Sequence, residues 1–167
     1  EPEPSGPFGG KAQSIPGKVE MEHYDEGEPG TAYKDVDANN LGADYRKNTQ
    51  VDIEKRADAS NGHGIGWIKA GEWLNYSVEI AETGTYDIKI PVASQKEGGL
   101  FHLEVEGKDL TGPIRLIDTG SWTQLKTVTH KGLKLKKGSH VIRVVMDENG
   151  KTGYVGDIDC MIFSRSN

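Results

Sequence analysis

The chain has few of the features that mark membrane proteins, disulfide-rich domains or nucleic-acid-binding proteins. Its one cysteine, Cys160, excludes a disulfide within the chain, and the apolar run that follows indicates a buried, inert thiol. No apolar run approaches the roughly 20 residues of a membrane span. The net charge of −6 argues against nucleic acid, because phosphates are bound by an excess of lysine and arginine. A neutral polar partner is compatible with this balance.

Apolar residues are also scarce, at 34% of 167 residues, whereas glycine reaches 22 residues. This balance favours many short strands joined by turns over long helices. The length suits one domain with a sizeable core. The opening residues are rich in proline and glycine and resemble the end of an interdomain linker. We therefore expect 1–14 to be a linker remnant and 15–167 to be a single module cut from a longer secreted protein.

Strict alternation of apolar and polar residues predicts the strands. In the clearest example, 74–80, Leu74, Tyr76 and Val78 alternate with polar residues, as in a half-buried strand. Shorter stretches of the same kind lie at 19–22, 51–54, 86–92, 101–105, 133–135 and 141–146, with a last strand at 158–163. About eight to ten short strands without a helical period predict an all-β sandwich of the jelly-roll type.

The sequence contains no motif that requires catalysis. It has no Gly-x-Ser-x-Gly nucleophile elbow, no His-Glu-x-x-His pair and no Walker-type loop. With 26 acidic residues, pairs of carboxylates suited to glycoside hydrolysis arise by chance. We therefore predict a binding domain, with a small β-sandwich glycoside hydrolase and a protein-binding adhesion domain as the alternatives.

Two tryptophans, Trp67 and Trp122, lie beside turns rather than within an alternating row. Loops often carry recognition, and flat aromatic faces suit the apolar C–H faces of sugar rings. Asp157 follows Gly156 at the entry to the last strand. If these loops meet at one end of the sandwich, two indoles can hold one sugar between them. Alternatively, the indoles cover the end of the core.

Glu20 and Glu22 are expected on one face of a short strand, with Val19 and Met21 on the other. Two carboxylates this close repel each other unless a positive charge compensates them. Calcium takes about six to eight oxygen ligands and favours carboxylates and carbonyls. A solvated strand edge is the other interpretation, and the residues alone leave both open.

The segment 66–76, Gly-Trp-Ile-Lys-Ala-Gly-Glu-Trp-Leu-Asn-Tyr, resembles the Gly-aromatic-Ile-x-x-Gly-acid-Trp-x-x-Tyr segment of carbohydrate-binding module family 6. Other segments resemble the same family in the same order, namely its Glu-x-Glu strand at 19–25, its Gly-x-Tyr and Val-Ala-Ser positions at 84–86 and 92–94, and its Thr-Gly-x-Trp turn at 119–122. The resemblance implies a non-catalytic jelly roll attached to a polysaccharide-degrading enzyme. It also implies a structural calcium ion and a sugar cleft among the loops at one end.

By this resemblance, Trp67 and Trp122 fall on the two aromatic positions that hold a sugar between them. Asp157 falls where many members have an asparagine that hydrogen-bonds the ligand. A carboxylate only accepts hydrogen bonds, so this departure selects sugar hydroxyl donors and disfavours anionic sugars.

The resemblance also assigns the calcium ligands and so favours the metal interpretation of the paired glutamates. Glu20 and Glu22 fall on the calcium carboxylates, and Asp159 on the acid of the last strand that completes the site. Arg46 is expected to supply a backbone carbonyl to the ion.

The loop that contains Asn39, Asn40 and Tyr45 resembles the form found in modules of marine agarases and related β-glucanases. We therefore expect the ligand to be a neutral galactan such as agarose, bound at a chain end, with these three residues as secondary contacts. Xylan and β-glucan stay open as ligands. The expected protein is an extracellular monomeric module tethered to a glycoside hydrolase such as a β-agarase, with neither nucleic acid nor a membrane as partner.

Overall fold

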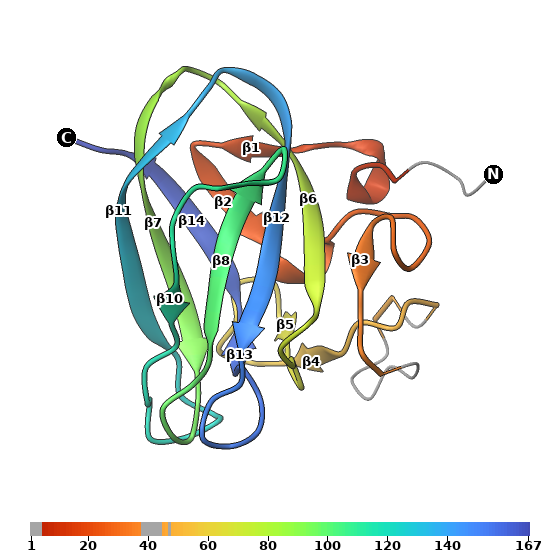
Figure 1. Ribbon diagram of the computed structural model, residues 1–167, viewed down its shortest axis with the longest axis vertical. Coiled ribbons are helices and arrows are strands. Elements are labelled where there is room, and N and C mark those ends of the chain that lie inside the picture. Colours follow the sequence, from red (N-terminus) through yellow and green to blue (C-terminus); the bar gives the residue numbers. More distant parts are fainter. Residues whose placement is uncertain (1–4, 38–44, 47) are drawn as a thin grey trace.

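The computed structural model describes residues 5–37, 45–46 and 48–167, and almost all of its regular secondary structure is strands, arranged in two curled sheets packed face to face (Figure 1). The strands of the first sheet are β1 (Gln13–Ile15), β3 (Tyr33–Lys34), β6 (Trp73–Ile80), β8 (Leu100–Val105), β9 (Lys108–Asp109), β10 (Ile114–Arg115) and β12 (Gly138–Glu148). Their order is β1-β6-β12-β8-β10, with β3 beside β6 and β9 beside β8.

The second sheet carries the strands that border the predicted sugar cleft and the predicted calcium ligands. Its strands are β2 (Gly17–Glu20), β4 (Ile53–Lys55), β5 (His63–Ile65), β7 (Gly84–Ala93), β11 (Lys126–Leu135), β13 (Asp157–Ile158) and β14 (Cys160–Arg165). Their order is β2-β14-β7-β13-β5-β4, with β11 beside β7. Two short 3-10 turns, η1 (Phe8–Gly10) and η2 (Met21–His23), complete the described elements. The predicted all-β sandwich is confirmed.

Alternation places the core between the sheets. In β6, Leu74, Tyr76 and Val78 are buried as the sequence predicts. Tyr86 of β7 and Phe101 of β8 are also fully buried, and each large side chain of this kind contributes about 1.5–3 kcal/mol by leaving water. Cys160 is a buried free thiol, as expected. Among the described residues, no helix has the length and apolar character needed to cross a membrane.

The N-terminal segment joins the fold earlier than the expected boundary at residue 15. Gln13 pairs with Val78 as β1 runs parallel to β6, whereas the other strand pairs are antiparallel. Further upstream, Gly6 and Glu26 exchange two backbone hydrogen bonds of 2.9 and 2.8 Å. Part of the segment expected to be a linker is therefore packed against the sandwich.

Candidate functional site

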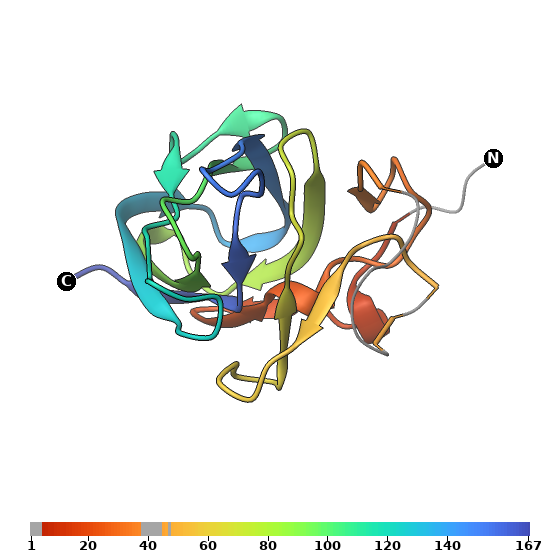
Figure 2. The same cartoon turned by 90° about the horizontal axis from the view of Figure 1, so that it is seen from below.

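A cleft with a volume of about 270 Å³ lies at one end of the sandwich. Its lining residues come from strand β4, from the loops before β6 and β11, and from the entry to β13, and they are Glu54, Trp67, Trp122, Tyr154 and Asp157. In Figure 2, which views this end, the loops leading into β11 and β13 and the segment between β5 and β6 lie next to one another. Segments far apart in sequence therefore meet in one concave surface.

Volume alone does not single out this cleft. A larger hollow of about 730 Å³ lies over β6, β8 and β12, where its lining includes Asn75, Glu104 and Arg143. The described residues that line this hollow include no tryptophan, tyrosine or phenylalanine. The smaller cleft combines three aromatic side chains with two carboxyl groups, which is the combination that a polar ligand with apolar faces requires.

Trp67 is presented to solvent by a strained turn. Trp67 is 37% exposed. Its backbone φ of 50° lies in the left-handed region that non-glycine residues rarely adopt. Such a conformation costs on the order of 1–3 kcal/mol and is found most often at functional sites. Close packing explains the glycine at the preceding position 66, because a Cβ on Gly66 would lie 3.1 Å from Asp157 Oδ1.

Trp122 belongs to a turn that is tied to the sheet. The Thr119 hydroxyl donates to the carbonyl of Ser121 (2.8 Å) and accepts from the backbone N–H of Ser94 (3.0 Å). Thr119 is buried, so these bonds fix the turn from its inner side. The Trp122 residue is half-buried and lines the cleft together with Trp67.

The floor of the cleft is acidic, and the guanidinium of Arg56 lies against its carboxyl groups. Asp157 is 6% exposed and Arg56 is 4% exposed. Arg56 Nη1 donates to Asp157 Oδ2 (3.1 Å) and to Glu54 Oε2 (3.3 Å). Burial, followed by the hydrogen-bonded Glu54 carboxyl, raises the pKa of Asp157, while Arg56 opposes that rise. The floor therefore presents carboxyl oxygens that can accept hydrogen bonds from a ligand.

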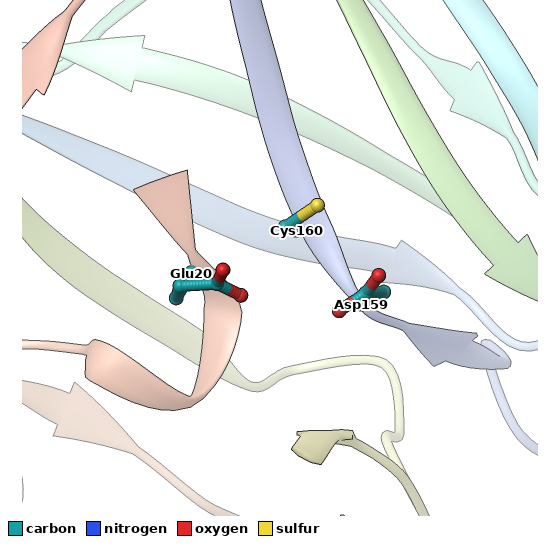
Figure 3. Close-up of side chains that lie close together, drawn as sticks. All are labelled: Glu20, Asp159 and Cys160. Atoms are coloured by element: carbon teal, nitrogen blue, oxygen red, sulfur yellow. The ribbon is translucent and has the colours of Figure 1, made fainter. Parts of the chain in front are cut away.

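A second cluster of acids lies between β2 and β14, where Glu20 is in register with Cys160 (Figure 3). Ligand atoms of Glu20, Asp159 and Cys160 all lie within 4.8 Å of one another. The Ser60 hydroxyl donates to Glu20 Oε1, and the Ser60 backbone N–H donates to both Asp159 oxygens (3.2 and 3.1 Å).

Glu22 approaches this cluster from η2, because β2 ends at Glu20 and the chain turns there instead of continuing as a strand. Glu20 Oε2 and Glu22 Oε2 are buried and accept no hydrogen bond from the described residues. Burial raises the pKa of Glu22 to about 7, with smaller contributions from Glu20 and Asp159. Burial also raises the pKa of the Cys160 thiol to about 12, so the thiol stays protonated and is a poor metal ligand. The remaining donors are oxygens, which fit a hard cation such as calcium.

The sequence matches the family model of carbohydrate binding module family 6 over residues 42–165, about three quarters of the chain. The chain belongs to this family. A family 6 domain is a non-catalytic carbohydrate-binding module, so the alternative of a small glycoside hydrolase is set aside.

Solved structures of other family 6 modules share the fold of this module. A β-1,3-glucan-binding module from Bacillus halodurans is 22% identical with a TM-score of 0.67, and the match covers 93% of this chain and 100% of that one. A module of Cellvibrio mixtus lichenase 5A in complex with cellotriose is 23% identical with a TM-score of 0.65, covering 92% and 99%. A Clostridium cellulolyticum module in complex with xylose is 19% identical with a TM-score of 0.65, covering 92% and 100%.

A curated relative is much longer than this module. The α subunit of clotting factor G from Tachypleus tridentatus is 27% identical over 88 residues, which are 52% of this chain. The chain spans 13% of that relative's length.

The structure brings Trp67, Trp122 and Asp157 of the module into one cleft, as the sequence analysis expected. It adds Glu54 and Tyr154, which sequence reasoning missed. The outward position of Glu54, next to the buried Ile53 in a short alternating stretch, is the signal that could have drawn attention to it. Tyr154 stands among loop glycines, a setting typical of an exposed aromatic.

The residues expected as secondary ligand contacts are Asn39, Asn40 and Tyr45. Asn39 and Asn40 lie outside the described residues. Tyr45 does not line the cleft: its hydroxyl hydrogen-bonds His23 Nε2 (2.8 Å) and its ring stacks on His63 with centroids 4.5 Å apart. A role of Tyr45 in ligand binding stays a prediction.

Arg46 supports the acid cluster through its side chain. The guanidinium lies 3.8 Å above the centroid of the Tyr24 ring and donates to the carbonyl of Glu22 (3.1 Å). Its own carbonyl oxygen accepts hydrogen bonds from Thr49 N (3.0 Å) and Thr49 Oγ1 (2.9 Å). Arg46 thus holds the turn that carries Glu22, and its role as a carbonyl ligand of the metal stays a prediction.

Proposed function

We propose that this module binds neutral polysaccharide at chain ends in the cleft between Trp67 and Trp122, and thereby holds an attached hydrolase at its substrate. The observation that carries the proposal is the meeting of these two indoles with Asp157 in one cleft. The indoles would stack on the apolar faces of a sugar ring, and the carboxyl oxygens would accept hydrogen bonds from its hydroxyl groups. A volume of about 270 Å³ favours a short terminal segment over a long stretch of chain.

Agarose is the first ligand to test, because the loop around Asn39 and Tyr45 resembles that of agarase modules. Related modules are described as binding β-1,3-glucan or as complexes with cellotriose and xylose. β-Glucan and xylan are therefore the other ligands to compare. All three are neutral, as an acidic cleft floor requires.

We also propose a structural calcium ion held by Glu20, Glu22 and Asp159. Two buried carboxylate oxygens without hydrogen-bond donors among the described residues support it. The proposed setting is extracellular, with the module as a monomer tethered to a glycoside hydrolase such as a β-agarase.

Affinity electrophoresis in gels that contain agarose, xylan, β-1,3-glucan or a soluble cellulose derivative tests the cleft. Trp67→Ala and Trp122→Ala should each weaken binding by about 2 kcal/mol, the usual cost of truncating a central aromatic anchor. Trp73→Ala is the matched control, because this third tryptophan lies outside the cleft and stacks under Arg143 at 3.7 Å. Unchanged retardation of both cleft variants would refute the proposal, whereas retardation in a gel other than agarose would replace only the ligand.

A further inference from the structure

Arg56 occupies a central position beneath the cleft although it does not line it. It follows β4 directly, and its backbone N–H donates to the carbonyl of Gly62 (2.8 Å), which fixes the turn between β4 and β5. Its side chain is only 3% exposed. A buried guanidinium has lost its hydration, so the contacts that replace water determine its orientation.

One nitrogen of Arg56 connects three parts of the cleft. Nη1 donates to the backbone carbonyl of Trp122 (2.7 Å), to Asp157 Oδ2 (3.1 Å) and to Glu54 Oε2 (3.3 Å). These acceptors belong to the loop before β11, to β13 and to β4. The aromatic side of the cleft and its acidic floor are therefore held by the same atom.

The other two nitrogens of Arg56 hold the guanidinium in place from behind. Nε and Nη2 donate to the two oxygens of Asp58 at 2.9 and 2.8 Å, a two-pronged contact. Such pairs fix the plane of the guanidinium, which the single ammonium of a lysine cannot do. All three nitrogens of Arg56 thus already have acceptors within the chain.

We propose that Arg56 is a positioning residue that sets the separation between Trp122 and Asp157, and that the cleft selects neutral, hydroxyl-rich sugars because the Arg56 guanidinium is committed to acceptors within the chain. The proposal rests on the function proposed above for the same cleft. An arginine at a binding site often serves as a receptor for carboxylate or sulfate groups. Here each guanidinium nitrogen already donates to an acceptor of the chain, and three carboxyl groups, from Glu54, Asp58 and Asp157, lie against the guanidinium, so an anionic sugar would meet an acidic floor.

The test compares Arg56→Lys with wild type in the neutral polysaccharide that retards the wild-type protein. Lysine keeps the charge and loses the planar set of donors, so binding should weaken about ten- to hundredfold if the geometry of the guanidinium matters. Arg165→Lys is the matched control, because Arg165 pairs with exposed Glu82 instead of with the cleft, and it should bind as wild type. Circular dichroism and a melting curve show whether each variant is folded.

Two further variants keep the test decisive should Arg56→Lys be unstable. Asp58→Asn weakens the two-pronged support at a partly exposed side chain and should reduce affinity about three- to tenfold. In a background of Asp157→Asn, replacing Arg56 should cost less than it does in wild type, because one of the two groups that it aligns is already altered. If replacing Arg56 only destabilised the fold, its cost would be the same in the Asp157→Asn background as in wild type.

The outcomes separate this inference from the proposed function. Retardation of wild type together with unchanged binding by Arg56→Lys and Asp58→Asn would overturn the positioning role alone. Binding of wild type to polygalacturonate, abolished by Arg56→Lys, would also overturn it, because Arg56 would then act as an anion receptor. Failure of folded wild type to bind any neutral polysaccharide would overturn the proposed function, and this inference with it.

Discussion

Calcium removal should lower the melting temperature of this module. In the acid cluster, Glu20 Oε2 and Glu22 Oε2 are buried without a hydrogen-bond donor among the described residues. Each buried polar atom left without a partner costs about 1–3 kcal/mol, so the two together cost about 2–6 kcal/mol unless a cation binds them. This sum is what an ion in the cluster can recover.

The expected shift follows from linkage. Calcium at about a hundred times its dissociation constant stabilises the folded state by about 2.7 kcal/mol, if it binds only that state. This value lies within the range set by the two oxygens. In a domain of this size, each kcal/mol moves the melting temperature by about 2–4 °C. Saturating calcium should therefore raise the melting temperature by about 5–11 °C over the value in chelator.

Scanning calorimetry with EDTA and then with increasing calcium measures this shift. Glu22→Gln removes one proposed ligand and should lose most of the response, whereas Glu26→Gln alters an exposed glutamate and should keep it. A wild-type melting temperature that is the same in EDTA and in calcium would refute the metal site and leave the sugar cleft untouched.

Two further predictions concern a buried acid and a close contact. Burial raises the pKa of Glu72 to about 8, above its ordinary value of 4.5, so its contribution to stability is complete below pH 4.5 and is lost as the pH rises through 8, by on the order of 5 kcal/mol. Glu72→Gln should flatten this fall in urea titrations, and an unchanged pH profile would contradict the assignment. In Gly66→Ala, the new Cβ would lie 3.1 Å from Asp157 Oδ1 and 3.4 Å from Glu54 Oε2, so isothermal titration should show weaker sugar binding. Gly6→Ala, whose Cβ would meet open space, should bind as wild type, and equal affinity of both variants would refute the contact.

The sequence predicts the parts of the fold in which burial alone sets the pattern. β6 and β7 alternate because one face of each lies against the core, and this period is visible in the residues themselves. The parallel pairing of β1 with β6 has no such signature, because Gln13–Ile15 is short and its partner is some 65 residues away. The turn at Met21 is hidden for a similar reason: Met21 is buried whether the chain continues as a strand or turns into η2.

The candidate site divides in the same way. Trp67 and Trp122 could be found because large aromatics beside turns are unusual for core residues. Glu54 could not be assigned to the cleft, because its position depends on β4 lying at the edge of its sheet, paired only with β5 among the described strands. Tyr154 depends on the path of a loop, which local sequence does not determine.

The contact between Asp157 and Arg56 is a feature of the cleft that the sequence does not reveal. The family resemblance leads one to expect an asparagine at position 157, and a neutral amide there would need no counter-ion. The structure has an acid there that is 6% exposed and whose pKa is raised by burial, and Arg56 opposes that rise from 3.1 Å. The two residues are 101 positions apart in sequence, so neither predicts the other. In the structure the acid at position 157 and the arginine at position 56 form one feature, so the loss in sugar affinity from replacing both should be less than the sum of the losses from replacing each one alone.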